Sequence, residues 1–222
     1  MTARLPSPYS NYAYAVLTSQ ALRAPDAVAV TQPGRGDVTY AELDARVNQR
    51  AYALASTGVQ AGTRVAALLS DPMAIIELYL AQAKLGAVTA AMNPYWPDDV
   101  LAAVSETSGC QAFVYDMATA AAVSRVRGQL PQIGTWMHIG GPADGALDLD
   151  ALTANASSDP PVLGAAAEDP LALFYTSGTT GLPKAVVHTH ASATAVAQIW
   201  LDIPRSRGGA FATGLRETSC RG

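Results

Sequence analysis

The stretch FYTSGTTGLPK at residues 174–184 concentrates hydroxyl side chains, glycines and a lysine in one short segment. Apolar segments typical of strands lie on both sides of it, at 171–175 and 185–187. Glycine allows backbone amides to approach a ligand closely, and clustered N–H and O–H donors form a nest for an anion. Because Lys184 adds a positive charge, the segment predicts a loop that binds phosphate.

This loop differs from the common P-loop, in which the lysine directly follows the last glycine and precedes Ser or Thr and then a helix. Here Leu182 and Pro183 separate Gly181 from Lys184, and a strand-like segment follows. A surface turn rich in Ser and Thr is the alternative, but an ordinary turn has no need of this residue order. The sequence therefore indicates a phosphate loop of another kind.

Residues 176–184 match the signature Thr-Ser-Gly-Thr-Thr-Gly-x-Pro-Lys-Gly as far as its lysine. The chain thereby resembles the adenylate-forming superfamily, which includes acyl-CoA synthetases, adenylation domains of nonribosomal peptide synthesis and luciferases. Ala185 stands where the family usually has glycine, and we expect this change to be tolerated. Two shorter segments, at 38–43 and 85–94, agree with the family in order and spacing, although helix-capping and turn roles account for them without any function.

The resemblance implies carboxylate activation. In this family a carboxylate oxygen attacks the α-phosphorus of ATP to give an acyl-adenylate and pyrophosphate, and many members then transfer the acyl group to a thiol, often that of coenzyme A. Positioning and charge neutralisation would supply most of the catalysis. The resemblance assigns the binding of the ATP phosphates to the following residues of the loop: Thr176, Ser177, Gly178, Thr179, Thr180, Gly181 and Lys184.

The family's other functional elements do not occur in the sequence. They are an aromatic-Gly-x-Thr-Glu element whose acid helps to bind Mg²⁺, a Tyr-x-Thr-Gly-Asp element that holds the ribose, and a C-terminal domain with the catalytic lysine. The resemblance thus implies ATP with Mg²⁺, and CoA as co-substrate of an intact enzyme, but it assigns no catalytic residue and no metal ligand to this chain. Fatty, aromatic and amino acids all remain open as the small carboxylic acid substrate.

His188 and His190 are two positions apart, so they would share one face of a strand. A metal site would need a third ligand, and none lies nearby in the sequence. The family often carries a histidine at the position of His190, for which we expect a packing or loop-positioning role first and a place in the substrate pocket second. Asp148 and Asp150 have no partner base, and we interpret them as solvated surface residues.

The composition is that of a folded protein without a nucleic-acid partner. The 222 residues are 50% hydrophobic and 14% charged, with a net charge of −4, which argues against disorder and against a nucleic-acid surface. Two cysteines, Cys110 and Cys220, do not make a disulfide framework, and residues 1–10 lack the apolar core of a signal peptide. We therefore expect a cytoplasmic protein, and no apolar run reaches the roughly 18 residues of a membrane span.

Strand-like and helix-like segments alternate along much of the chain. The expected strands lie at 27–31, 38–40, 64–69, 87–92, 112–115, 135–139, 171–175 and 185–187, and the expected helices at 11–23, 41–56, 72–86, 97–109, 117–129 and 191–201. This alternation predicts an α/β fold with parallel-rich sheets flanked by helices. By the resemblance, it would be the first part of the large N-terminal domain of an adenylate-forming enzyme. We expect residues 140–168 to form a connection with one helical turn near 149–152, and 171–190 to begin a second set of strands.

The domain expectation follows from these observations. Residues 1–204 would be a partial N-terminal AMP-binding domain with its phosphate loop at 174–185, and the C-terminal domain would be absent. The tail at 205–222 holds four arginines, four glycines and a cysteine, and we expect it to be disordered or aberrant. The leading hypothesis is a truncated ATP-dependent carboxylate ligase, and the alternative is a non-catalytic remnant that binds nucleotide weakly or acts as an interaction fragment. The sequence does not predict the oligomeric state.

Overall fold

The computed structural model describes residues 10–176 and 181–202. Within them, seven strands form one sheet in the order β7-β6-β5-β3-β4-β8-β9, and two more strands, β1 and β2, form a separate hairpin. The strands are β1 (Val28–Gln32), β2 (Gly36–Thr39), β3 (Arg64–Leu68), β4 (Val88–Ala91), β5 (Ala112–Asp116), β6 (Thr135–Ile139), β7 (Leu147–Asp148), β8 (Pro170–Thr176) and β9 (Lys184–Thr189). Neighbours in the large sheet pair in parallel, except that β8 and β9 are antiparallel. The predicted α/β fold is confirmed.

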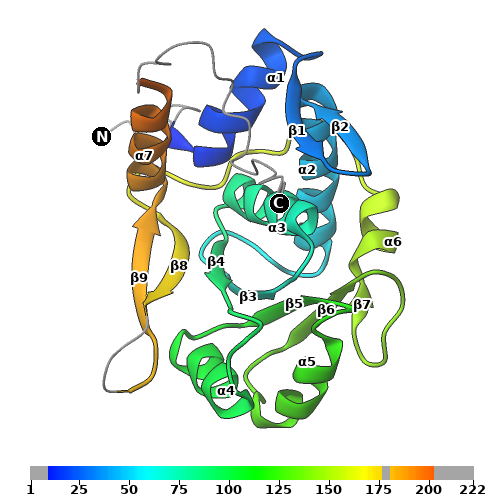
Figure 1. The fold of residues 1–222 in the computed structure, drawn as a ribbon, viewed down its shortest axis with the longest axis vertical. Helices are drawn as coiled ribbons and strands as arrows, with labels where there is room; N and C mark the ends of the chain where they lie inside the picture. Colours follow the sequence, from blue (N-terminus) through cyan, green and yellow to red (C-terminus); the bar gives the residue numbers. More distant parts are fainter. Residues whose placement is uncertain (1–9, 177–180, 203–222) are drawn as a thin grey trace, which may run out of the picture.

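Helices cover both faces of the large sheet (Figure 1). The helical segments are η2 (Tyr14–Thr18), α1 (Ser19–Arg23), α2 (Tyr40–Ser56), α3 (Pro72–Leu85), α4 (Asp98–Thr107), α5 (Ala120–Val126), η3 (Arg127–Gln129), α6 (Leu149–Ala154) and α7 (His190–Asp202). Val65 and Met137 pack in one buried cluster with α2 and α3, whereas Phe113 and Trp136 pack in a second cluster with α4 and α5. Because successive strand residues point to opposite faces, the two clusters bury both faces of the parallel strands.

Local sequence signals set the helix ends. Thr39 and Glu42 form a capping box at the start of α2, in which Glu42 N donates to Thr39 Oγ1 at 3.2 Å and Thr39 N donates to Glu42 Oε2 at 2.9 Å. Asp71 caps α3 with its side chain. Gly86 ends α3 with a φ of +73°, and a Cβ atom at this position would lie 2.5 Å from Gly164 O, so the close approach requires glycine. The helix-capping and turn roles expected for the segments at 38–43 and 85–94 are confirmed at Thr39 and Gly86.

The expectation of a second set of strands is wrong. β8 pairs in parallel with β4 through the partners Thr89↔Ala172 and Ala90↔Leu173, so the β8–β9 hairpin extends the first sheet. The reason is the burial of three successive residues, Leu171, Ala172 and Leu173. Such a run fits a strand that is covered on both faces.

The connection at 140–168 contains more structure than expected, namely the edge strand β7 and the helix α6. Asp148 caps α6 with its side chain. Asp150 accepts a hydrogen bond from Arg50 Nη1 at 3.0 Å, and Arg50 Nη2 donates to Glu77 Oε2 at 3.2 Å. Both side chains remain partly exposed, that of Asp150 at 42%, as expected of surface residues, but Asp148 also starts α6 and Asp150 joins it to α2.

The helix expected at 117–129 divides into α5 and η3. Thr119 N donates to Asp116 Oδ1 at 3.1 Å, and Thr119 Oγ1 donates to Leu68 O at 2.7 Å. These bonds hold a turn after β5, so α5 begins only at Ala120.

A buried ion pair joins distant parts of the chain. Lys84 is 1% exposed and donates through Nζ to Asp44 Oδ1 at 2.7 Å and to Asn48 Oδ1. Thr18 donates to the same oxygen of Asp44 at 2.7 Å, and Asn48 Nδ2 donates to Ser158 O at 2.8 Å. Burial lowers the pKa of Lys84, and its hydrogen bond to Asp44 opposes this shift. The network ties the N-terminal helical segment, α2, α3 and the 140–168 connection to one another.

We predict that Lys84→Met lowers the free energy of unfolding by about 3–5 kcal/mol, because it leaves the Asp44 carboxylate buried without its cation. The measurement is denaturant-induced unfolding followed by far-UV circular dichroism. Lys184→Met is the matched control, since Lys184 is exposed and should change stability by less than about 0.5 kcal/mol. The double variant Lys84→Met, Asp44→Leu should regain most of the loss. A loss below about 1 kcal/mol in Lys84→Met would contradict the structural role given to the pair.

Candidate functional site

The β8–β9 hairpin carries the loop that the sequence predicts to bind phosphate (Figure 1). Thr176 lies opposite Lys184 in the antiparallel register, and Thr176 Oγ1 donates to Lys184 O at 3.5 Å. Both residues are exposed, as is Gly181. The other predicted phosphate-binding residues lie outside the described part of the chain, and their role stays a prediction: Ser177, Gly178, Thr179 and Thr180.

The position of the hairpin in the sheet suits a ligand. The loop follows the carboxyl end of β8, which runs parallel to β4 and β3. In open α/β sheets, ligands bind outside the carboxyl ends of the parallel strands. Thr176, Gly181 and Lys184 therefore come together at the edge where such sheets present donors to a bound anion.

The crevice between β3 and β5 is the other place at this edge where a ligand could bind, because the chain leaves these strands toward opposite faces. Asp116 occupies it. Its Oδ2 accepts hydrogen bonds from the backbone N–H groups of Ser70 at 2.5 Å and Asp71 at 3.2 Å. Asp116 is buried, with 7% of the residue exposed. The donors at this crevice are thus already used by a carboxylate of the chain itself, which leaves the end of β8 as the better anion site.

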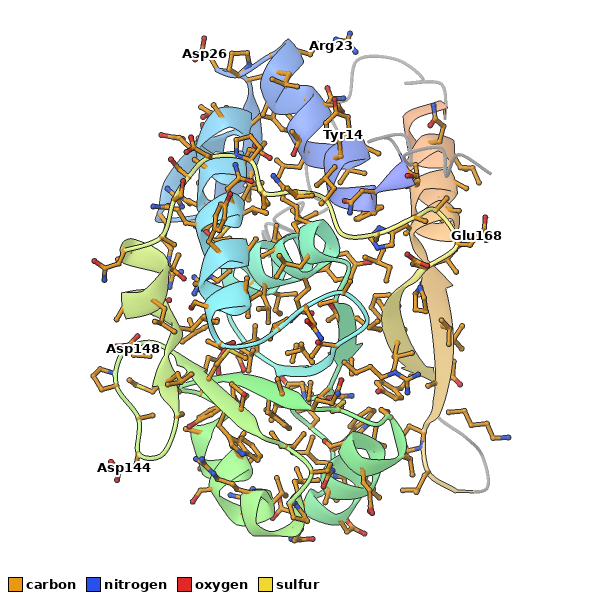
Figure 2. All side chains as sticks on the ribbon, turned by 180° about the vertical axis from the view of Figure 1, so that it is seen from behind. Tyr14, Arg23, Asp26, Asp144, Asp148 and Glu168 are labelled. Atoms are coloured by element: carbon orange, nitrogen blue, oxygen red, sulfur yellow. The ribbon has the colours of Figure 1, made fainter. Side chains whose placement is uncertain are left out.

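The acidic residues around β7 lie away from the hairpin. Figure 2 shows Asp144 and Asp148 on the β7 side of the molecule, and β7 and β9 are the opposite edges of the sheet. Within residues 10–176 and 181–202, no three His, Cys, Asp or Glu side chains are grouped so that they could hold a metal ion.

The two histidines after the loop have different environments. β9 ends at Thr189, so His188 lies on the strand while His190 begins α7. The His188 ring packs edge-to-face against Phe174, with ring centroids 5.2 Å apart. His190 is fully buried, and its Nδ1 accepts from the backbone N–H of Tyr12 at 3.0 Å.

His190 is held in its neutral form. Burial lowers its pKa, and the nearby Asp169 opposes this shift. Because Nδ1 accepts a hydrogen bond, the proton resides on Nε2, which has no hydrogen-bond partner among the described residues. This contact gives His190 a packing role that fastens the N-terminal segment to the start of α7, and its place in a substrate pocket stays a prediction.

A cavity of about 510 Å³ lies between α3, the β8–β9 hairpin and α7. Apolar side chains form most of its lining, among them Ile75 and Tyr79 of α3, Phe174 of β8 and Val196 of α7. His188 also lines it, whereas His190 is not among its lining residues. This cavity was not predicted from the sequence, although α3 is apolar on nearly all sides, which is typical of a helix with more than one packed face.

The fold and the loop together define a class of protein, in which an open α/β sheet carries a candidate phosphate loop at the carboxyl end of a parallel strand. The profile of the family described as "AMP-binding enzyme" matches residues 17–213. The chain belongs to this family of adenylate-forming, acyl-CoA synthetase-like proteins.

Three relatives illustrate the similarity. The long-chain-fatty-acid–CoA ligase FadD13 of Mycobacterium tuberculosis is 33% identical over 166 residues, which are 73% of this chain and 32% of the relative. The inhibitor-bound N-terminal domain of FACL13 from Mycobacterium tuberculosis aligns with a TM-score of 0.72 at 30% identity, over 81% of this chain and 44% of that domain. ATP-bound MatB from Rhodopseudomonas palustris aligns with a TM-score of 0.68 at 26% identity, over 82% of this chain and 35% of MatB.

The chain thus spans about a third of the length of the full-length relatives that it matches. The solved N-terminal domain confirms the expectation that the fold is the first part of such a domain. No helix in the described ranges is long and apolar enough to cross a membrane.

We predict that His190 makes the stability of the fold depend on pH. Its pKa is lowered below 6.5 in the folded state, so the unfolded chain takes up the proton more readily. The stability that His190 contributes is therefore complete above about pH 6.5 and is lost as the pH falls toward its folded-state pKa. Unfolding of the wild type and of His190→Gln should be compared from about pH 8 to pH 5.

His190→Gln should show a weaker loss of unfolding free energy toward acid than the wild type. The two proteins are compared by the slope of their unfolding free energy against pH. This slope reports the titration of His190, whereas a difference that is constant with pH reports lost packing. Identical slopes would contradict a buried, neutral His190.

Proposed function

We propose that the chain is the nucleotide-binding first part of an ATP-dependent ligase that activates a carboxylic acid. In this reaction a carboxylate oxygen of the substrate attacks the α-phosphorus of ATP, the bond from that phosphorus to the β-phosphate bridge oxygen breaks, and pyrophosphate leaves. Transfer of the acyl group to the thiol of CoA would follow in the complete enzyme. The pairing of Thr176 with Lys184 at the carboxyl end of β8, in a chain of this family, is the observation that carries the proposal.

The described residues suit the phosphates of ATP. Lys184 is exposed and supplies an ammonium group that would offset the negative charge of the β- and γ-phosphates. Thr176 supplies a hydroxyl group, and Gly181 is exposed and has no side chain that would keep a ligand away from its backbone. The same role is proposed for Ser177, Gly178, Thr179 and Thr180 between them. Mg²⁺ would accompany ATP, and the described residues hold no group of three His, Cys, Asp or Glu side chains that could bind it.

The acid substrate and the cellular compartment of the protein can be proposed only as general classes. The relatives named above include a long-chain-fatty-acid–CoA ligase, and we propose a small-molecule carboxylic acid for this chain, with fatty acids as one class among several. Cys110 is a free, buried cysteine, and burial raises its pKa to about 12. Such a thiol behaves as a small apolar residue, which agrees with a protein of the reducing cytoplasm.

Exposed apolar residues of the hairpin and α7 favour a second candidate function, that of a fragment that binds nucleotide without catalysis. Phe174, Val186 and Val187 are 44%, 44% and 55% exposed, and Ile199 on α7 is 62% exposed. Exposed apolar patches of this kind often mark contacts with further protein. A segment that needs such contacts to complete its site could bind ATP and still not form an acyl-adenylate.

We predict that the chain binds ATP and that Lys184→Ala weakens this binding about 10- to 100-fold, because a hydrogen bond to a charged group contributes roughly 1.5–3 kcal/mol. Isothermal titration calorimetry measures the affinity. Arg23→Ala is the matched control, since Arg23 is an exposed cation at the far end of α1 (Figure 2). Equal ATP affinities of the wild type and Lys184→Ala would contradict the proposed role of Lys184 in binding the phosphates.

An assay of ATP–pyrophosphate exchange over a panel of carboxylic acids separates the two candidate functions. Exchange that depends on one acid and is lost in Lys184→Ala would support the ligase. We expect ATP binding without exchange from the chain alone, because the family's ribose-binding and metal-binding elements do not occur in it. If the wild type does catalyse exchange and Lys184→Ala retains it at the same rate, both candidates are contradicted.

A further inference from the structure

Tyr175 is the residue through which the base of the candidate phosphate loop meets the helical layer. Side chains alternate along β8, so Tyr175 points to the face that α4 covers, whereas Phe174 points to the cavity on the opposite face and is 44% exposed. Tyr175 directly precedes Thr176, the residue paired with Lys184.

Both ends of α4 hold this tyrosine. The Trp96 ring, just before α4, meets the Tyr175 ring edge-to-face, with centroids 5.3 Å apart and planes at 80°. Ser108, just after α4, forms a hydrogen bond of 2.7 Å between its Oγ and the Tyr175 hydroxyl. An aromatic edge contact and a hydrogen bond thus fix one ring both in position and in rotation.

The partners of Tyr175 are themselves fixed. Ser108 is 6% exposed, its N–H donates to Val104 O at 3.0 Å, and its carbonyl accepts from Arg64 Nη1 at 2.9 Å. Asp98 at the start of α4 forms an ion pair of 2.6 Å with Arg125 of α5. α4 is therefore held in place by contacts that do not involve the loop.

We propose that Trp96 and Ser108 are positioning residues for ATP, which act by holding Tyr175 and thereby the point where β8 enters the phosphate loop. The inference rests on the proposed function, because it concerns the same site. Burial raises the pKa of Tyr175 to about 12, so the phenol keeps its proton at neutral pH and adds no negative charge beside the loop. The two residues do not contact ATP in this account; they keep Thr176 and Lys184 in place for it.

The experiment compares Ser108→Ala, Tyr175→Phe and the double variant in the full chain, with ATP as the probe in calorimetry. Each single change should weaken ATP binding about three- to tenfold, and the double variant should be no weaker, because all three remove the same hydrogen bond. Thr107→Ala is the matched control, since Thr107 Oγ1 donates to Ala103 O within α4 at 2.8 Å; it should bind ATP as the wild type does. Trp96→Phe should retain the affinity that Trp96→Ala loses.

Hydrogen exchange of residues 170–176 without ATP provides a readout that does not depend on the proposed function. Exchange should be faster in Ser108→Ala and Tyr175→Phe than in the wild type and in Thr107→Ala. If the wild type binds ATP and the variants bind it equally well, or if the two single losses add in the double variant, the inference is overturned. If the wild type binds no ATP, the proposed function fails, and hydrogen exchange alone tests the contact between α4 and β8. Faster hydrogen exchange in the variants then supports the anchoring of β8 by α4, and unchanged hydrogen exchange overturns it.

Discussion

The antiparallel pairing of β8 with β9 is the constraint on which the site depends. Its register places Thr176 opposite Lys184, so the residues between them must close a loop within one hairpin. β8 is fixed in turn by its parallel pairing with β4 and by the burial of Leu171, Ala172 and Leu173. A hydroxyl group and a cation are thereby presented at the carboxyl edge of the sheet by main-chain pairing, which reduces the conformational entropy that a ligand would have to remove.

The outer strand of the same hairpin is largely exposed. β9 forms one edge, and Val186 and Val187, which point to opposite faces, are 44% and 55% exposed. The parallel strands at the centre are buried on both faces, as parallel sheets usually are. The candidate ligand site thus lies at an exposed edge of the described sheet.

Local signals explain what the sequence predicted well, and distant contacts explain what it did not. The capping box of Thr39 and Glu42 lies within four residues. The alternation of strand-like and helix-like segments predicted the α/β fold from the spacing of apolar residues. By contrast, the pairing of β8 with β4 and the bond of Lys84 to Asp44 join residues far apart in the chain. For the site, the resemblance assigned the phosphate-binding residues, and their role stays a prediction. The cavity beside Phe174 and the ring contacts of Tyr175 were not predicted, because they require elements distant in the chain to meet in space.

The most direct test of the central claim is an amide chemical-shift titration of the isotope-labelled chain with ATP. The account predicts that the largest shifts fall between Thr176 and Lys184, with smaller ones at Tyr175 and along β9, while the crevice around Asp116 stays unchanged. Shifts centred on Asp116 or on the cavity beside α3, or no shifts at ATP concentrations that saturate a related ligase, would contradict the assignment of the β8–β9 loop as the nucleotide-binding site.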